Sequence, residues 1–359
     1  MTMTMGTMGR TAARRERTRP LPNTRADYVS ALEHLSELSV CKYHDPFTDI
    51  DWDAPAHRID PEDMRLAIPD DHALAQTAWY AGLSDSTRAR FGLHFLAQTV
   101  KYGIGFEAVL SRGLLEFCQT LPDRRPETRY ALHEVIEEAR HSQMFQELID
   151  RSGVDTQPIR GMAAFMDDRV AHLGRTQPCL FFFAVLGGEL FIDEQNRSAL
   201  RRPKHSVHPL VRLIMKIHVM EEARHVCFAQ RYLQEHLPAL PAWRRTYMGF
   251  VIPFMFSEAA RLMLVPDARI VREFDIPREA LAQAFGPGSE HRRQLHDSTE
   301  PMRQLCAQHG MLQPAHGWLW RRAAVAPGFP SHPPPSRRAP GSVRSPARRR
   351  RWYSGSTLS

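Results

Sequence analysis

The pentapeptide EEARH occurs twice in this chain of 359 residues, starting at positions 137 and 221. Both copies lie where apolar residues recur every three or four positions, which is the spacing of a helix with one buried face. Residues three apart share a helix face, so Glu138 points the same way as His141, and Glu222 the same way as His225. One Glu-x-x-His pair is common on solvated helices, whereas two pairs in apolar surroundings favour the two halves of one buried metal site.

Two further carboxylates lie in apolar stretches upstream of the two pentapeptides. Glu107 lies in KYGIGFEAVLSRGLL and Glu189 in FFFAVLGGELFIDEQ. A bundle that holds two metal ions takes a Glu-x-x-His from each of two helices and one Glu from each of two others. These two residues are candidates for the second role, with Glu194 as the alternative to Glu189. A lone carboxylate in so apolar a stretch is costly to bury unless a cation neutralises it.

An additional histidine distinguishes the second pentapeptide from the first. His218 precedes Glu222 by four residues and shares its helix face, whereas the first copy has Glu134 at the equivalent position. We therefore predict that His218 is a ligand, with a hydrogen-bonded core histidine as the alternative. The complete set of predicted ligands is Glu107, Glu138, His141, Glu189, His218, Glu222 and His225.

The chemistry of this set favours two iron ions. Four carboxylates balance the charge of two divalent cations, so the filled site would be neutral, as burial requires. Mixed carboxylate and imidazole ligands suit iron or manganese, and a mixed iron–manganese pair remains an alternative. The first Glu of each copy, Glu137 or Glu221, precedes an arginine by three residues, which predicts intrahelical ion pairs with Arg140 and Arg224.

The rest of the sequence predicts one all-α domain over residues 26–320. Helical patterns cover residues 86–120, as one helix or two, and residues 126–151, 158–174, 178–201, 209–236 and 242–264. Weaker helices are expected over residues 268–310, packed onto the bundle. Strand-like alternation is almost absent from the sequence.

The charge and composition exclude several classes of protein. Residues 1–25 carry a charge of +5 and residues 321–359 carry +9, so subtracting both from the net +7 leaves −7 for residues 26–320. Both ends are predicted to be disordered basic tails, and no specific nucleic-acid partner is expected. No apolar run reaches about 18 residues, so no membrane span is predicted. Five cysteines without a Cys-x-x-Cys pair indicate a reducing cytoplasm rather than a disulfide framework or a structural zinc site.

The order of these motifs resembles the p-aminobenzoate N-oxygenase family of ferritin-like di-iron enzymes. The resemblance rests on a single Glu, a Glu-x-x-His, a Glu followed by Asp193 in ELFIDEQNR, and the sequence HVMEEARH that begins at His218. It covers roughly residues 85–235. It implies a ferritin-like di-iron helical bundle with additional C-terminal helices and the seven ligands named above. It also implies that Asp193 hydrogen-bonds a ligand histidine and that Arg140 and Arg224 brace the ligands.

The resemblance also implies an activity. A di-iron centre of this family uses O2 to oxidise an aromatic amine to the hydroxylamine, nitroso and nitro compounds, with electrons from an external donor. For this chain we expect a p-aminobenzoate-like substrate, a role in secondary metabolism and a homodimer. The pocket is expected to draw on the Phe and Leu residues near Leu180 to Leu186 and on Tyr102. Lys101 is a candidate to receive a substrate carboxylate, with an exposed, solvated side chain as the alternative.

Three other functions fit the same ligands. A hydroxylase or desaturase acting on another small molecule would use the same metal site. A ferroxidase or iron-storage protein would not need His218. A radical-generating subunit would need a tyrosine beside the metals, for which Tyr102 and Tyr130 are available.

Overall fold

The computed structural model describes residues 25–159, 162–286, 289, 291–292, 295, 299–312 and 318–320. The chain divides into two compact units, Met1–Pro327 and Gly328–Ser359, and the described residues all belong to the first. The two predicted tails lie outside the described residues, apart from Arg25, which begins the first helix. All regular structure in the described part is helical, with no strand among these residues, which confirms the predicted all-α class.

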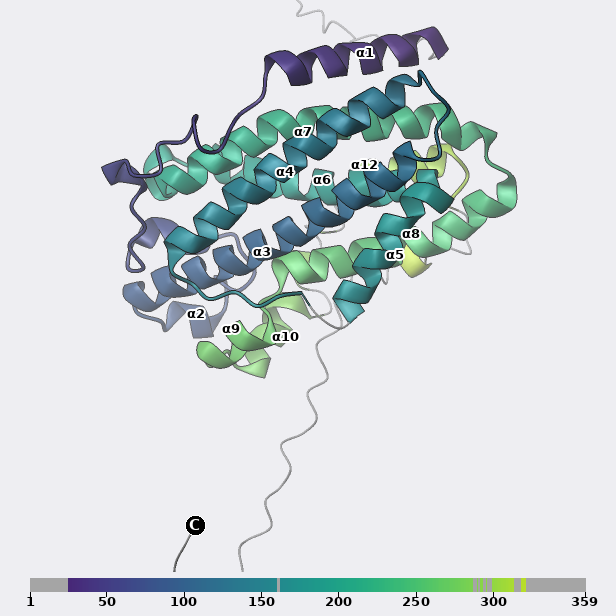
Figure 1. Cartoon of the computed structure of the whole chain (residues 1–359). Helices are drawn as coiled ribbons and strands as arrows, with labels where there is room; N and C mark the ends of the chain where they lie inside the picture. Colours follow the sequence, from purple (N-terminus) through teal and green to yellow (C-terminus); the bar gives the residue numbers. More distant parts are fainter. Residues whose placement is uncertain are drawn as a thin grey trace, which may run out of the picture. The chain divides into compact units, whose positions relative to one another are not determined.

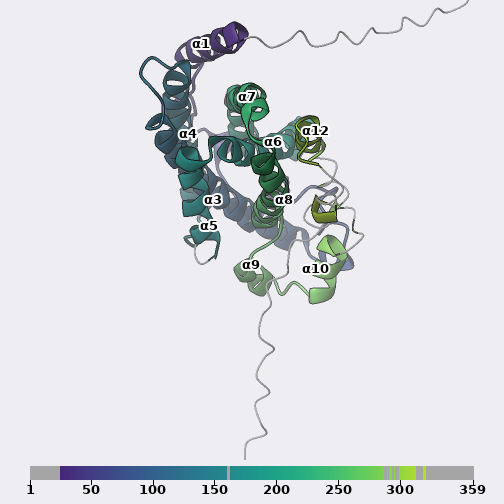
Figure 2. The same ribbon diagram turned by 90° about the vertical axis from the view of Figure 1, so that its right-hand side faces the viewer.

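Four long helices form the centre of the bundle (Figure 1). They are α3 (Asp85–Cys118), α4 (Pro126–Ser152), α6 (Pro178–Arg201) and α7 (Pro209–His236). Seen end-on, α3 lies against α4, and α6 lies against α7 (Figure 2). The pattern over residues 86–120 is thus a single helix, and the other three predicted helices match the observed bounds to within one residue.

Local sequence signals account for the ends of these four helices. Proline occupies the first position of α4, α6 and α7. An N–H group at this position has no partner within the helix, so the lack of one in proline costs no hydrogen bond. The side chain of Ser84 caps α3 by accepting a hydrogen bond from the N–H of Thr87. α4 ends at Gly153, whose φ of 67° lies in the left-handed region that glycine adopts without strain.

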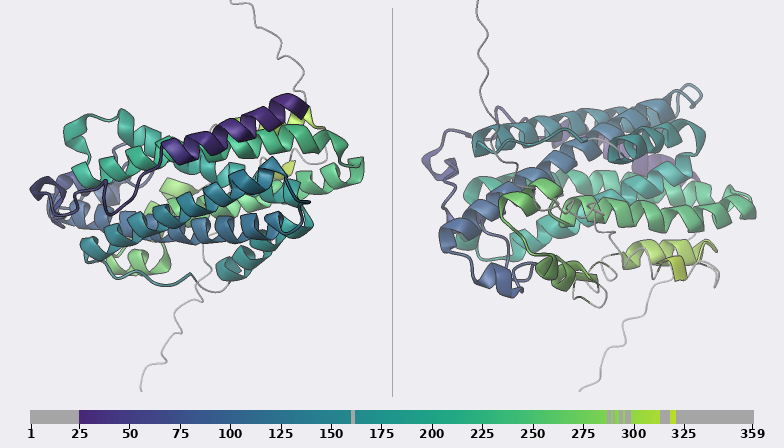
Figure 3. Two further views of the ribbon diagram at one scale, coloured as in Figure 1. Left: turned by 45° about the horizontal axis from the view of Figure 1, so that its top comes forward. Right: turned by 90° about the horizontal axis from the view of Figure 1, so that it is seen from below.

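The remaining helices cover this centre. α1 (Arg25–Cys41) packs along the outside of α4 and α7 (purple in Figure 3), and α5 (Met162–Thr176) packs against α3 and α6. α8 (Ala242–Leu264) lies against α6 and α3. Shorter elements complete the described part: α2 (Ala78–Ala81), α9 (Ala268–Glu273), α10 (Arg278–Phe285), α12 (Glu300–Gln308), and the 3₁₀ turns η1 (Pro55–His57), η2 (Met64–Leu66), η3 (Lys204–Ser206) and η4 (Leu237–Ala239).

An aromatic cluster fills the bundle where the pocket was expected. Phe181, Phe182 and Phe183 are fully buried, and the ring of Phe182 stacks on Tyr232 with centroids 4.2 Å apart. The expectation that the Phe and Leu residues from Leu180 to Leu186 line the pocket is therefore wrong, because these side chains pack in the core and only Ala184 of this stretch borders the cavity. These rings hold α6 against α7, because aromatic side chains bury a large apolar area in fixed geometry.

One stretch of the described part, Ala242–Glu273, is long and apolar enough to cross a membrane by length and composition alone. Of the most apolar 18 residues in this stretch, 33% are buried inside the protein. Core helices of soluble proteins pass the same test, so the stretch is weak support for a membrane span.

Candidate metal centre

All seven predicted ligands meet between the four central helices, and each is at most 1% exposed. They form two groups, Glu107, His141, His218 and Glu222 in one, and Glu138, Glu189, Glu222 and His225 in the other. Within each group the candidate ligand atoms lie within 4.8 Å of one another. Because Glu222 belongs to both groups, the arrangement provides two adjoining positions for metal ions with a carboxylate shared between them.

The alternative carboxylate lies elsewhere. Glu194 is exposed and pairs with Nη2 of Arg201 at 2.7 Å. Glu189 is fully buried, and neither of its oxygens has a hydrogen-bond partner among the described residues. The structure thus places Glu189, rather than Glu194, among the candidate ligands.

His141 and His225 point the same ring nitrogen into the centre. Nδ1 of His141 lies 3.1 Å from Glu138 Oε2, and Nδ1 of His225 lies 3.0 Å from Glu222 Oε2. The i, i+3 spacing on α4 and α7 imposes this geometry. Nδ1 is therefore the atom that each histidine would offer to a metal.

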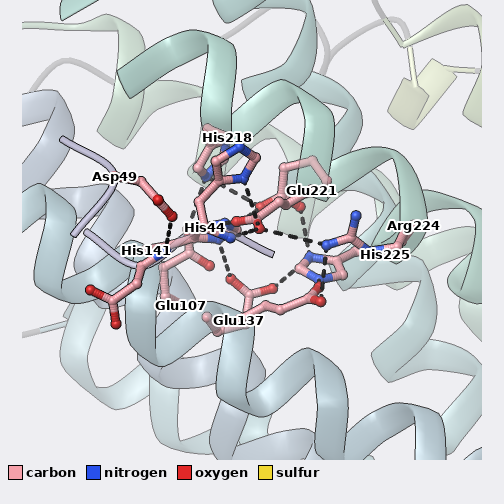
Figure 4. A network of polar contacts seen from close by, with 12 residues as sticks. His44, Asp49, Glu107, Glu137, His141, His218, Glu221, Arg224 and His225 are labelled. Carbon is pink, nitrogen blue, oxygen red and sulfur yellow. Dashed lines mark hydrogen bonds and ion pairs between the residues drawn. The ribbon is translucent and has the colours of Figure 1, made fainter. Parts of the chain in front are cut away.

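The outer nitrogens of the same histidines are held by carboxylates of the opposite helix. Nε2 of His141 lies 2.9 Å from Glu221 Oε2 on α7, and Nε2 of His225 lies 2.9 Å from Glu137 Oε2 on α4 (Figure 4). Each pentapeptide thus supplies an inner carboxylate to its own histidine and an outer carboxylate to the other. Such outer carboxylates fix the tautomer and orientation of a metal-binding histidine.

The predicted intrahelical ion pairs are accordingly only partly present. Arg140 packs over the ring of Tyr43 at 4.4 Å and makes no ion pair with Glu137 in the described part. Arg224 makes the predicted pair, with Nη2 3.7 Å from Glu221 Oε1 on its own helix, and it also reaches across to α4, where Glu137 Oε1 lies 2.9 Å from the same nitrogen. The reason is that both carboxylates face the α4–α7 interface, where they are buried, and not the solvent.

His44 is a contact that sequence reasoning did not find. Its backbone N–H donates to Glu221 Oε1 at 2.9 Å, and its Nδ1 lies 3.2 Å from the same oxygen. His44 follows α1 in an irregular segment, 177 positions before its partner. No local pattern links two residues so far apart.

His218 points its other ring nitrogen, Nε2, into the centre. Nε2 lies 3.3 Å from Glu107 Oε1 and 3.2 Å from Glu222 Oε1, and Nδ1 lies 3.2 Å from Nδ2 of Asn196 on α6. The residue that holds the outer nitrogen is thus Asn196. The expected role of Asp193 is wrong, because its carboxylate pairs with Nε of Arg197 one turn along the same helix, at 2.6 Å.

Burial and charge set the protonation of the centre. Burial raises the pKa of Glu107 and of Glu189 well above the ordinary value, and neighbouring carboxylates raise it further. Burial lowers the pKa of His218 to about 4, which leaves that ring neutral near pH 7.

In the two Glu-x-x-His pairs the pKa shifts have the opposite direction, because here the histidine pKa values are raised and the carboxylate pKa values are lowered. Burial opposes charge on both histidines, but the adjacent carboxylates raise the pKa of His141 and of His225 well above the ordinary value. Burial likewise opposes charge on Glu138, yet His225 and its other partners lower the pKa of Glu138 to about 2. The pKa of Glu222 is lowered well below its ordinary value for the same reason.

This protonation pattern fits two divalent cations. The raised pKa values favour protons on Glu107, Glu189, His141 and His225 in the absence of metal, and with these four protons the seven residues together are neutral. Replacing those protons by two divalent ions leaves the set neutral again, with every ligand atom free to bind. The unpartnered oxygens of Glu189 and of Glu107 Oε2 are further acceptors that a cation would satisfy.

Glu134 occupies the place on α4 that His218 occupies on α7. It is fully buried, and neither carboxylate oxygen has a hydrogen-bond partner in the described part of the chain. Burial raises its pKa to about 8, so it carries a proton at neutral pH. The two halves of the centre therefore differ by a neutral imidazole on one side and a neutral carboxylic acid on the other.

An apolar cavity of about 130 Å³ lies between α3, α5, α6 and α8. Phe106 and Gly188 line it, next in sequence to the candidate ligands Glu107 and Glu189. Tyr102 lies on the wall, as predicted from the sequence. Lys101 does not line the cavity, because it lies about a quarter turn around α3 from the wall.

Comparison with known proteins agrees with this geometry. The family described as p-aminobenzoate N-oxygenase AurF matches residues 25–310, a range that contains every candidate ligand. Uncharacterized proteins of Mycobacterium tuberculosis strain H37Rv and of Mycobacterium bovis are each 35% identical to the chain over 300 residues, which is 84% of this chain and 88% of theirs. No solved structure matches the chain.

Proposed function

The chain belongs to the p-aminobenzoate N-oxygenase AurF family, and from this membership we propose that it is a di-iron oxygenase that oxidises aromatic amines. The observation that carries the proposal is the position of His218. It gives one of the two adjoining groups two histidines, where the other group has one. A plain iron-storage site has no need of this additional ligand.

The proposed reaction has a definite demand for electrons. Conversion of an arylamine to its hydroxylamine by one O2 consumes two electrons and two protons and releases one water. The two electrons come from an external reductant. Further oxidation to the nitroso and nitro compounds would continue on the same nitrogen.

The residues of the chain have separate tasks in this scheme. Two bound iron ions would supply the chemistry that activates O2. The seven buried side chains would hold them, and Glu137, Glu221 and Asn196 would fix the orientation of the three ligand histidines. The apolar cavity beside Phe106 and Gly188 would hold the amine and exclude bulk water.

The remaining parts of the proposal concern the setting of the enzyme. We propose a homodimer in the cytoplasm, acting in secondary metabolism, without a nucleic-acid or membrane partner. Size-exclusion chromatography tests the dimer against the storage alternative, because a ferritin-like storage protein would form a much larger cage. A hydroxylase or desaturase would be recognised by oxidation at carbon instead of nitrogen.

A single-turnover experiment tests the activity. The iron-loaded protein is reduced without oxygen, mixed with an arylamine and exposed to ¹⁸O₂, and the products are identified by mass spectrometry. We expect an N-oxidised product that carries ¹⁸O. A fully metal-loaded protein that consumes O2 and leaves a panel of arylamines unchanged would contradict the proposal.

A further inference from the structure

The apolar cavity between α3, α5, α6 and α8 has the size of one aromatic ring. Its volume is about 130 Å³, and an engineered apolar cavity of roughly 150 Å³ is known to bind benzene. The wall is formed mainly by Phe106, Val109, Ala184, Gly188, Met255 and Phe256. A single-ring molecule would fill this space, whereas a fused-ring system would have to extend beyond it.

Gly188 is needed for the shape of the wall. A Cβ atom at this position would come within 2.1 Å of Cζ of Phe106, so the ring of Phe106 lies directly against the glycine backbone. Phe106 and Gly188 each precede a candidate ligand, Glu107 and Glu189. A ring in the cavity would therefore lie beside the two helices that carry these carboxylates.

The ionisable groups on the wall are acidic. Asp167, Glu258 and Tyr102 line the cavity, and the described lining residues include no lysine, arginine or histidine. Asp167 is half-buried, and burial together with the neighbouring Asp168 raises its pKa, although Arg112 opposes this effect.

Two arginines close to the wall residues, Arg112 beside Asp167 and Arg261 beside Tyr102, already have carboxylate partners. Arg261 donates to Glu258 through Nε at 2.9 Å and through Nη2, and Arg112 donates to Asp168 through Nη1 at 2.7 Å. An anionic substituent entering the cavity would meet Asp167 and Glu258 without gaining an unpaired cation. Repulsion between like charges in a partly buried site is strong enough to decide which ligand binds.

We propose that this cavity takes a single-ring arylamine whose other ring substituent is uncharged, and that it disfavours p-aminobenzoate itself. The inference rests on the proposed function, since it assigns the substrate class of that same site. It departs from the substrate in the family's name because of two residues of this chain, Asp167 and Glu258.

Binding of a matched pair of ligands tests the inference. 4-Aminobenzamide and 4-aminobenzoate have nearly the same shape and differ in charge. Their affinities for the iron-loaded, full-length protein are measured by calorimetry without oxygen, so that no turnover occurs. We expect the amide to bind at least about tenfold more tightly than the carboxylate. Equal affinity, or tighter binding of 4-aminobenzoate, would overturn the inference.

A variant locates the source of the preference. Asp167→Asn should tighten 4-aminobenzoate binding and bring the two affinities together, while leaving the affinity for the amide nearly unchanged. Asp150→Asn, which removes an exposed carboxylate on α4 that pairs with Gln146, serves as the matched control and should preserve the preference. A preference that survives Asp167→Asn unchanged would also overturn the inference.

The remaining outcomes separate this inference from the proposed function. If neither ligand binds, the assignment of the cavity as the substrate site is wrong, and the turnover experiment still decides the activity. If the amide binds preferentially but is never N-oxidised, the cavity assignment holds and the proposed function fails.

Discussion

Oε2 of Glu137 on α4 lies 2.9 Å from Nε2 of His225 on α7, so the carboxylate of one pentapeptide holds the histidine of the other. The same relationship in reverse joins Glu221 to His141 at 2.9 Å. In each copy of the pentapeptide, the first Glu thus contacts the histidine of the other copy across the interface of α4 and α7. Two identical pentapeptides therefore build one centre.

The first prediction follows from these two contacts between a carboxylate and a histidine of opposite helices. Glu137→Gln keeps a group that accepts a hydrogen bond from Nε2 of His225 but removes the charge that orients and polarises the ring. We expect iron affinity to fall about 10- to 100-fold while the helical circular dichroism spectrum is retained. Glu147→Gln, which alters a half-buried carboxylate paired with Arg151 on the same helix, is the control and should bind iron normally. Normal affinity in Glu137→Gln would show that the contact has no role in metal binding.

The second prediction concerns His218. His218→Ala should keep the fold, because the ring contacts mainly polar groups of the centre, and should lose both arylamine oxidation and part of the bound iron. Iron per chain is measured after gel filtration, and the fold is checked by circular dichroism. Asn196→Ala, which frees Nδ1 of the ring, should have a smaller effect on iron content. A His218→Ala variant that oxidises amines normally would remove His218 from the ligand set.

The third prediction is a release of protons on metal binding. Glu107, Glu189, His141 and His225 all have raised pKa values in the folded protein, which favours the protonated form of each without metal. Two ferrous ions that displace these protons should release close to four per chain, and the affinity should rise with pH. Release is followed with an indicator dye in weak buffer under nitrogen. Release of one proton or none would contradict the assigned protonation.

The fourth prediction concerns the stability of the metal-free protein. Burial raises the pKa of Glu134 from its ordinary value near 4.5 to about 8. Between these two values the folded state keeps a proton that the unfolded state has lost, so the free energy of unfolding falls as pH rises, by at most about 1.4 kcal/mol per pH unit. Glu134→Gln should remove this part of the slope. Urea unfolding of both proteins between pH 5 and pH 8 measures it, and parallel curves would count against the raised pKa.

The sequence was sufficient for the helices and for the inward face of each. Proline at the first position of α4, α6 and α7, and Gly153 after α4, mark helix ends by local backbone chemistry. The i, i+3 and i, i+4 spacings placed the ligands of α4 and α7 on one inner face of each helix, and the apolar stretches around Glu107 and Glu189 indicated that these two carboxylates are buried. The helix α1 was missed, since its apolar pattern is weak.

Contacts between helices could not be predicted from the sequence. Arg140 and Arg224 have the same position in identical pentapeptides, yet one packs on Tyr43 and the other bridges Glu137 and Glu221. Their different surroundings depend on which element packs over each helix. Apart from Tyr102, the wall of the cavity was missed for a similar reason, because composition does not distinguish a ring buried in the core from one that borders an empty space.

The most direct test of a two-metal centre is anomalous X-ray diffraction from crystals of the iron-loaded protein, measured on both sides of the iron absorption edge. We expect two iron peaks per chain between α3, α4, α6 and α7, one beside His141 and His218 and the other beside Glu189 and His225, with Glu222 close to both. A single peak, or iron bound away from these residues, would contradict the two-metal centre.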